Sequence, residues 1–175
     1  GGLTTTVDSL VSDDGSTRKL TKVGTGSVAL NGANSFAGIM RIEDGTVTIG
    51  TLAAAGANSA SGAYATAGEN GLELVGGTLA YTGGSTTVDR GLTVSGDSTL
   101  NLSAAGTTLT MGDSQGRDSS GTLTVTGGVG SSLSVGRVTV VEGVTLTLAP
   151  STIPMTVSTV RGYTSYPLPH SPLVL

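Results

Sequence analysis

Acidic side chains lie close to arginine or to one another at four places in the sequence, and these residues could do acid–base chemistry. Enzymes that cleave polysaccharides need converging carboxylates, often together with Ca²⁺ and a basic side chain. The densest of these groups is a polar loop between two expected strands, and it is the best candidate for such a site. Charged turns are more often solvated than catalytic, so we predict no catalytic residue. The four groups are Glu43/Asp44, Glu69/Glu73, Asp89/Arg90 and Asp113/Arg117/Asp118.

The sequence contains almost none of the histidine and cysteine side chains that support nucleophilic catalysis and metal binding. The sequence has no Cys and a single histidine, His170, which sits among prolines near the end of the chain. A general base has to be held in register by packing, and a proline-rich terminal segment is a poor place for that. Gly24-Thr25-Gly26 runs into an expected strand instead of a helix, so it is not a dinucleotide loop. We therefore predict no metal and no cofactor.

Composition and charge narrow the class of protein. The chain has 175 residues, of which 29 are Gly, while aromatic residues make up 3% and charged residues 11%. A net charge of −4 with eight basic residues leaves no basic stripe for nucleic acid. No apolar run reaches the roughly 18–20 residues of a membrane helix, so no transmembrane segment is predicted. Mean hydropathy of +0.22 argues against disorder.

Short runs in which aliphatic residues alternate with Thr or Ser, bounded by Gly, dominate the chain. Such period-2 patterns predict half-buried strands, and the Ala-rich stretch 52–67 is expected to be a long loop. The strands recur about every 20 residues, which predicts an all-β solenoid of stacked coils; an antiparallel sandwich is the alternative. Two series of aliphatic residues should stack from coil to coil: Leu79, Leu100, Leu123, Val144 and Leu72, Leu92, Leu109, Leu133.

Residues 20–47 read LTKVGTGSVALNGANSFAGIMRIEDGTV. This segment resembles the autotransporter-associated β-strand repeat of secreted bacterial proteins, and residues 76–102 resemble the segment that commonly follows it. The resemblance implies a right-handed parallel β-helix, export, and display outside the cell or at the bacterial surface, tethered to the outer membrane through a region not contained in these residues.

The motif residues have structural explanations that do not depend on the resemblance. Glycine can adopt positive φ at the corners of coils. Asn34 can hydrogen-bond to the backbone of neighbouring turns, and Phe36 can fill a wide corner of the interior. The residues expected to have structural roles are Gly24, Gly26, Gly32, Asn34, Phe36, Gly38 and Gly45.

Thr-x-Thr triplets such as Thr46/Thr48 and Thr122/Thr124 recur on the expected strands. Their irregular separation argues against a continuous threonine face of the kind seen in ice-binding solenoids. All five prolines lie at or beyond Pro150, where they disfavour a central strand. We therefore divide the chain into a β-helix domain (1–150) and a Pro-rich tail, linker or cap (151–175).

The sequence thus predicts a non-catalytic extracellular or cell-surface module, structural or adhesive, in the form of a stiff β-helical rod. Its expected partners are neighbouring coils of a longer chain or other copies, stacked end to end into fibres, together with a surface glycan or host protein. The alternative is a carbohydrate-active β-helix enzyme of the lyase or hydrolase type, with its site at Asp113, Arg117 and Asp118.

Overall fold

The computed structural model describes residues 2–64, 70–113, 119–140, 146–148 and 154–162. These residues form strands and connecting loops, and none of them is helical. The fifteen strands are β1 (Thr4–Val7), β2 (Leu20–Lys22), β3 (Ser27–Leu30), β4 (Met40–Ile42), β5 (Thr46–Ile49), β6 (Asn70–Leu74), β7 (Thr78–Tyr81), β8 (Thr86–Thr87), β9 (Gly91–Val94), β10 (Ser98–Leu102), β11 (Thr108–Met111), β12 (Gly121–Gly127), β13 (Ser132–Val140), β14 (Leu146–Leu148) and β15 (Met155–Gly162).

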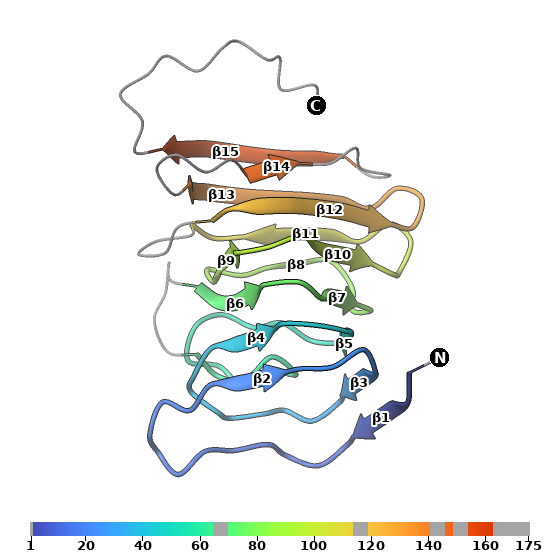
Figure 1. The fold of residues 1–175 in the computed structure, drawn as a ribbon, viewed down its shortest axis with the longest axis vertical. Helices are drawn as coiled ribbons and strands as arrows, with labels where there is room; N and C mark the ends of the chain where they lie inside the picture. The colour runs from blue at the N-terminus through green and yellow to red at the C-terminus, as the bar shows by residue number, and fades with distance from the viewer. Residues whose placement is uncertain (1, 65–69, 114–118, 141–145, 149–153, 163–175) are drawn as a thin grey trace.

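The strands stack into three parallel sheets, one rung above another along the long axis of the molecule (Figure 1). One sheet has seven strands in the order β1-β3-β5-β7-β10-β12-β14, and we call it the long sheet. The second, β2-β4-β6-β9, runs beside the first half of the stack, and the third, β15-β13-β11-β8, beside the second half. The predicted parallel β-solenoid is therefore confirmed, and the sandwich is excluded.

Coil length varies more than the predicted spacing of about 20 residues. In the long sheet, Val28 pairs with Val47, 19 residues on, whereas Val47 pairs with Leu79, 32 residues on. The extra residues of that coil belong to the segment between β5 and β6. Its described part, residues 51–64, forms a loop without a strand, as the sequence analysis expected for 52–67.

The predicted stacking series are right in part. Leu79 pairs with Leu100, but Leu100 pairs with Val125 and not with Leu123. A shift of two residues keeps every side chain on the same face of a strand, so alternation alone could not detect it. Val144 lies outside the described residues.

The second series spans two different sheets. Leu72 pairs with Leu92 in the sheet that ends at β9, and Leu109 pairs with Leu133 in the sheet that begins at β8. Leu92 and Leu109 are therefore not stacking partners, and this part of the prediction is wrong. The error arises because the second sheet ends at β9 while the third sheet begins at β8.

Aliphatic side chains fill the interior of the solenoid. Leu74, Ile42 and Leu102 are fully buried, and Phe36, the one phenylalanine of the sequence, is buried with them. Because each inward residue packs on its equivalents in the coils above and below, rows of Leu, Val and Ile exclude water without large aromatics. The core forms one continuous cluster from Leu30 to Val135.

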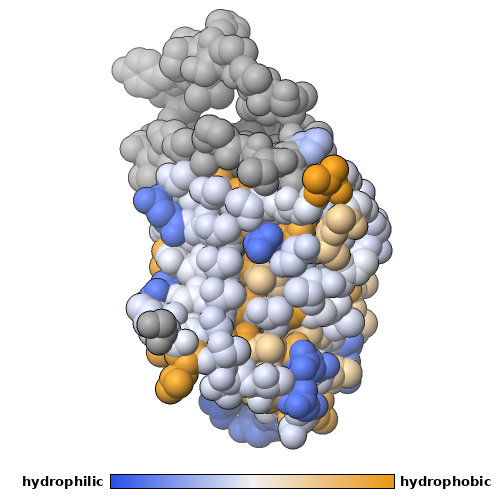
Figure 2. All heavy atoms as spheres, turned by 90° about the vertical axis from the view of Figure 1, so that its right-hand side faces the viewer, coloured by the Kyte–Doolittle hydropathy of each residue, from blue (hydrophilic) through white to orange (hydrophobic). Residues whose placement is uncertain are grey.

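On the outer face of the long sheet, hydroxyl side chains form one continuous column. The register connects Thr4, Ser27, Thr46, Thr78, Thr99 and Thr124. Irregular sequence separation therefore gives a regular column, contrary to the expectation, because loops absorb the differences in coil length. The neighbouring column contains Ala29, Ala80 and Asn101, so the face is not a two-column threonine array. Figure 2 shows pale, weakly polar residues over much of one side of the molecule, beside a band of hydrophobic residues, with strongly hydrophilic residues in patches.

Strand β15 lies in the range assigned to the Pro-rich tail. Its residues pair in parallel with β13 from Met155 to Gly162, so the solenoid extends at least to residue 162. The prolines at 167, 169 and 172 and His170 lie outside the described residues.

Candidate functional site

The repeat motif in residues 20–49 forms two successive rungs joined at a tight corner. Lys22 follows Leu20 on β2 and is the inward partner of Ile42 on the next coil. Its ammonium group donates to the carbonyl oxygens of Val23 (2.9 Å), Gly24 and Asp44 (3.2 Å). The lysine therefore fixes the corner by binding carbonyl groups of two coils at once.

The five motif glycines are needed for two different reasons. Gly24 and Gly45 have φ of 73° and 69°, in the left-handed region that favours glycine. The other three do not have positive φ, contrary to the expectation for all five. A Cβ on Gly26 would lie 2.8 Å from the Leu3 carbonyl oxygen, and one on Gly32 or Gly38 would overlap the backbone of Ser9 or Arg18. Close stacking on the preceding coil excludes a side chain there.

Asn34 connects three coils through its side chain and backbone. Its Oδ1 accepts a hydrogen bond from the Val11 amide (2.8 Å), and its Nδ2 donates to the Ala60 carbonyl (2.9 Å). Its backbone also bridges to Ser59. The side chain is fully buried, so these bonds satisfy groups that have no access to water.

Phe36 lies two residues further along the same wall and is 2% exposed. A Cβ on Gly62 of the next coil would come within 2.6 Å of its ring. The ring therefore fills a corner against a glycine of the long coil.

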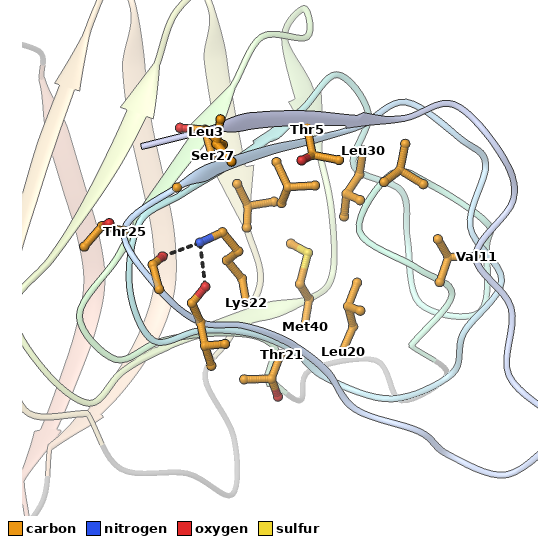
Figure 3. Close-up of a pocket in the computed structure, with 16 residues that line it drawn as sticks. Leu3, Thr5, Val11, Leu20, Thr21, Lys22, Thr25, Ser27, Leu30 and Met40 are labelled. Atoms are coloured by element: carbon orange, nitrogen blue, oxygen red, sulfur yellow. Dashed lines mark hydrogen bonds between the residues drawn. The ribbon is translucent and has the colours of Figure 1, made fainter. Parts of the chain in front are cut away.

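The beginning of the solenoid has an open pocket of about 460 Å³. In Figure 3 Leu20, Leu30 and Met40 point into it, and Lys22 reaches past it toward the corner carbonyls. The pocket is the interior of the first coil, whose outer strands β1 and β2 each pair on one side only among the described residues. It can accept apolar groups, and the ammonium of Lys22 is already bonded to the backbone.

The polar loop predicted around Asp113 is only partly described, because Arg117 and Asp118 lie outside the described residues. Asp113 Oδ1 accepts from the Arg137 amide (2.8 Å), and its Oδ2 lies 3.2 Å from the Arg137 guanidinium. The carboxylate therefore joins two coils, a role that its neighbours in sequence did not indicate.

The other acidic candidates also bind groups of the chain itself. Arg41 contacts both Glu73 and Glu43 at 2.7 Å, and these hydrogen bonds, to Glu73 first, raise the pKa of its guanidinium. Asp89 accepts from the Ala55 amide at 2.7 Å. Glu69 lies outside the described residues.

In the described part of the chain, no group of three His, Asp or Glu residues is placed to hold a metal ion. Within the same residues, no helix is long and apolar enough to cross a membrane. Sequence reasoning did not find the contacts made by two charged residues, Lys22 and Arg90. Lys22 could have been found from its inward position on an alternating strand, where a charge needs partners; Arg90 was considered only as half of a charge pair.

A parallel β-solenoid with glycine-tight corners, an inward lysine and a buried Asn–Phe pair defines the chain as a β-helical repeat module. Residues 20–49 match the family model of the passenger-associated-transport-repeat. The chain is 37% identical over 159 residues to the adhesin BmaC autotransporter of Brucella suis biovar 1 (strain 1330). That match covers 86% of this chain and 4% of the relative. No solved structure matches the chain. Residues 20–49 therefore carry a repeat of the passenger-associated-transport type.

Proposed function

We propose that this chain is a structural or adhesive module of a passenger displayed at the bacterial cell surface. The observation that carries the proposal is the similarity of nearly the whole chain to an autotransporter adhesin. The structure adds physical support, because the motif residues Lys22, Asn34 and Phe36 all hold adjacent coils together. A rod stabilised in this way can hold a binding surface away from the envelope.

Surface binding without turnover is the result we expect. The purified chain would be passed over immobilised host-surface proteins and a glycan panel, with binding followed by interferometry and reducing ends measured on the same glycans. Saturable binding that the heat-unfolded chain lacks, with no new reducing ends, supports the proposal. Glycan cleavage that Asp118→Ala abolishes would replace it with the enzyme, and absence of binding to every surface would overturn the adhesive function.

Display and tethering form a separate part of the proposal. Protease treatment of intact cells that carry the full-length passenger should remove the epitope of this chain, while a periplasmic marker stays intact. Protection of the epitope until the cells are lysed would contradict surface display.

End-to-end assembly of copies is a further part of the proposal, and it requires that the edge strands at the two ends of the solenoid can pair. Strands β1 and β14 are the two outer strands of the same sheet, so a second copy can continue the long sheet. The second walls differ, because β2 and β15 belong to different sheets. Rods that lengthen with concentration in light scattering and negative-stain microscopy would support assembly, and a constant monomer mass would exclude it.

A further inference from the structure

Arg90 is the largest fully buried side chain of the described structure, with no exposed surface. It follows β8, on the coil above the long loop 51–64. Its alkyl stem passes Gly71, where an added Cβ would lie 3.2 Å from the arginine Cδ. A buried arginine is costly unless its charge and its hydrogen-bond donors are satisfied.

Among the described residues, the hydrogen-bond partners of this guanidinium come from the long loop. Nη2 lies 2.9 Å from the Gly62 carbonyl oxygen, 3.0 Å from that of Ala57 and 3.2 Å from that of Ala54. Nη1 donates to the Ser61 hydroxyl at 3.2 Å. Nε is buried and has no hydrogen-bond partner, so the contacts concentrate on the outer edge of the guanidinium.

These carbonyl groups converge because the loop makes two tight turns beside the guanidinium. The Ala57 amide bonds to the Ala54 carbonyl at 3.1 Å, and the Gly62 amide bonds to the Ser59 carbonyl at 2.9 Å. Each turn directs carbonyl oxygens toward one centre. The partial negative charges of three carbonyls and one hydroxyl form a site that suits a planar cation with several donors.

The position of the loop explains why such a site is needed. Below it, Asn34 and Phe36 bond to Ser59 and Ala63 through the backbone. Above it, the third sheet begins with β8, and residues 51–64 contain no strand that could join a ladder with it. Inward-facing carbonyls without a ladder partner need other donors. The Ala54 carbonyl accepts from the Ala57 amide and the Gly62 carbonyl from the Ser59 hydroxyl (2.9 Å), and Arg90 adds a donor to both and to the Ala57 carbonyl.

We propose that residues 54–62 form a guanidinium-binding site that Arg90 occupies from within the same chain, and that the bound cation fixes the conformation of this loop. The flanking rungs do not need the cation. Strands β5 and β7 pair with each other through the register Thr46–Thr78 to Ile49–Tyr81. The long coil is therefore a loop folded around a cation and inserted into a stack held by backbone ladders.

The test is chemical rescue of the Arg90→Ala variant, followed by hydrogen–deuterium exchange read by mass spectrometry. We expect amides in 54–62 to exchange at least tenfold faster than in the wild type, while β10 and β12 keep their protection. Millimolar ethylguanidinium should restore protection of the loop, and ethylurea, which is neutral and of similar shape, should not. The matched control is Arg41→Ala, which removes an arginine at the surface of the second sheet and should leave the loop unchanged.

Several results would overturn the proposal. Unchanged exchange in 54–62 would show that the loop does not depend on Arg90, and equal rescue by ethylurea would show that packing and not charge matters. If Arg90→Ala does not fold, Arg90→Lys provides the measurement, since an ammonium can bind part of the site. Its loop should exchange at a rate between those of the wild type and an unbound loop, and protection equal to the wild type would refute the requirement for a guanidinium.

Discussion

Replacement of Asn34 by alanine tests whether a polar clamp or apolar stacking sets the stability of the first coils. The amide side chain is fully buried and bonds to the Val11 amide in the coil before it and the Ala60 carbonyl in the long coil after it. Alanine keeps the backbone bridge to Ser59 but removes both side-chain hydrogen bonds.

The expected cost follows from the groups that lose their partners. A buried donor or acceptor left unsatisfied costs about 1–3 kcal/mol, and Asn34→Ala leaves one of each. The bond to Val11 is only partly buried, so water can reach that amide and its share falls near the lower limit. The free energy of unfolding should therefore decrease by about 3 kcal/mol, taking the middle of that range for Ala60.

Urea denaturation followed by circular dichroism gives the comparison, with Asn31→Ala as the matched control. Asn31 lies in the same turn, and among the described residues its side chain bonds to the exposed Asp8 carboxylate (2.7 Å), so its loss should cost less than about 0.5 kcal/mol. Since coils of a solenoid can unfold separately, hydrogen exchange should show that the loss is concentrated at Val11 and Ala60. Equal midpoints for the two variants would refute the clamp.

Three further predictions concern packing and charge. Gly38→Ala should destabilise the protein by about 1–3 kcal/mol or more, because the new Cβ would overlap the Arg18 carbonyl; Gly50→Ala, whose Cβ would meet its nearest atom at 3.7 Å, should be neutral in the same urea melt. Leu74→Ala should cost about 2–5 kcal/mol, since Leu74 is fully buried, and a loss under 1 kcal/mol would contradict the continuous core. The hydrogen bond from Arg18 lowers the pKa of Asp14 from 3.8 to about 2; the stabilisation is therefore complete above pH 3.8 and lost as the pH falls through about 2, and a carboxyl NMR titration with a midpoint near 3.8 would disprove the pairing.

The sequence predicted which residues of a strand face the core, but not which residues of the next coil they pair with. Alternation placed Val47, Leu79 and Leu100 inside, because the two faces of a strand differ in exposure whatever the strand pairs with. Pairing of Leu100 with Val125 could not be predicted, since a two-residue shift gives the same alternation. The change from the second sheet to the third has no local signal either, because Thr86 and Thr87 form a strand only by pairing with Leu109 and Thr110 of the next coil.

The same holds for the candidate site: the sequence indicated which residues belong to the motif, but not what each of them contacts. The motif from Leu20 to Val47 was recognisable because its glycines and Asn34 fall on the pattern of the β-strand repeat that this segment resembles. Their individual roles depended on the neighbouring coil: Gly38 is tight because of Arg18, and Asp113 binds Arg137, 24 residues away. Residue type could not indicate these contacts, because they join positions separated by a whole coil.

By itself, the sequence determined that this chain forms short strands around an aliphatic core, since period-2 alternation and glycine corners are local properties of the chain. Only the tertiary structure decided which rungs pair, where the third sheet begins and what Lys22 and Arg90 bind. The physical reason is that a charged side chain buried in a solenoid is satisfied by carbonyl groups of adjacent turns and coils, and coil length decides which carbonyls those are.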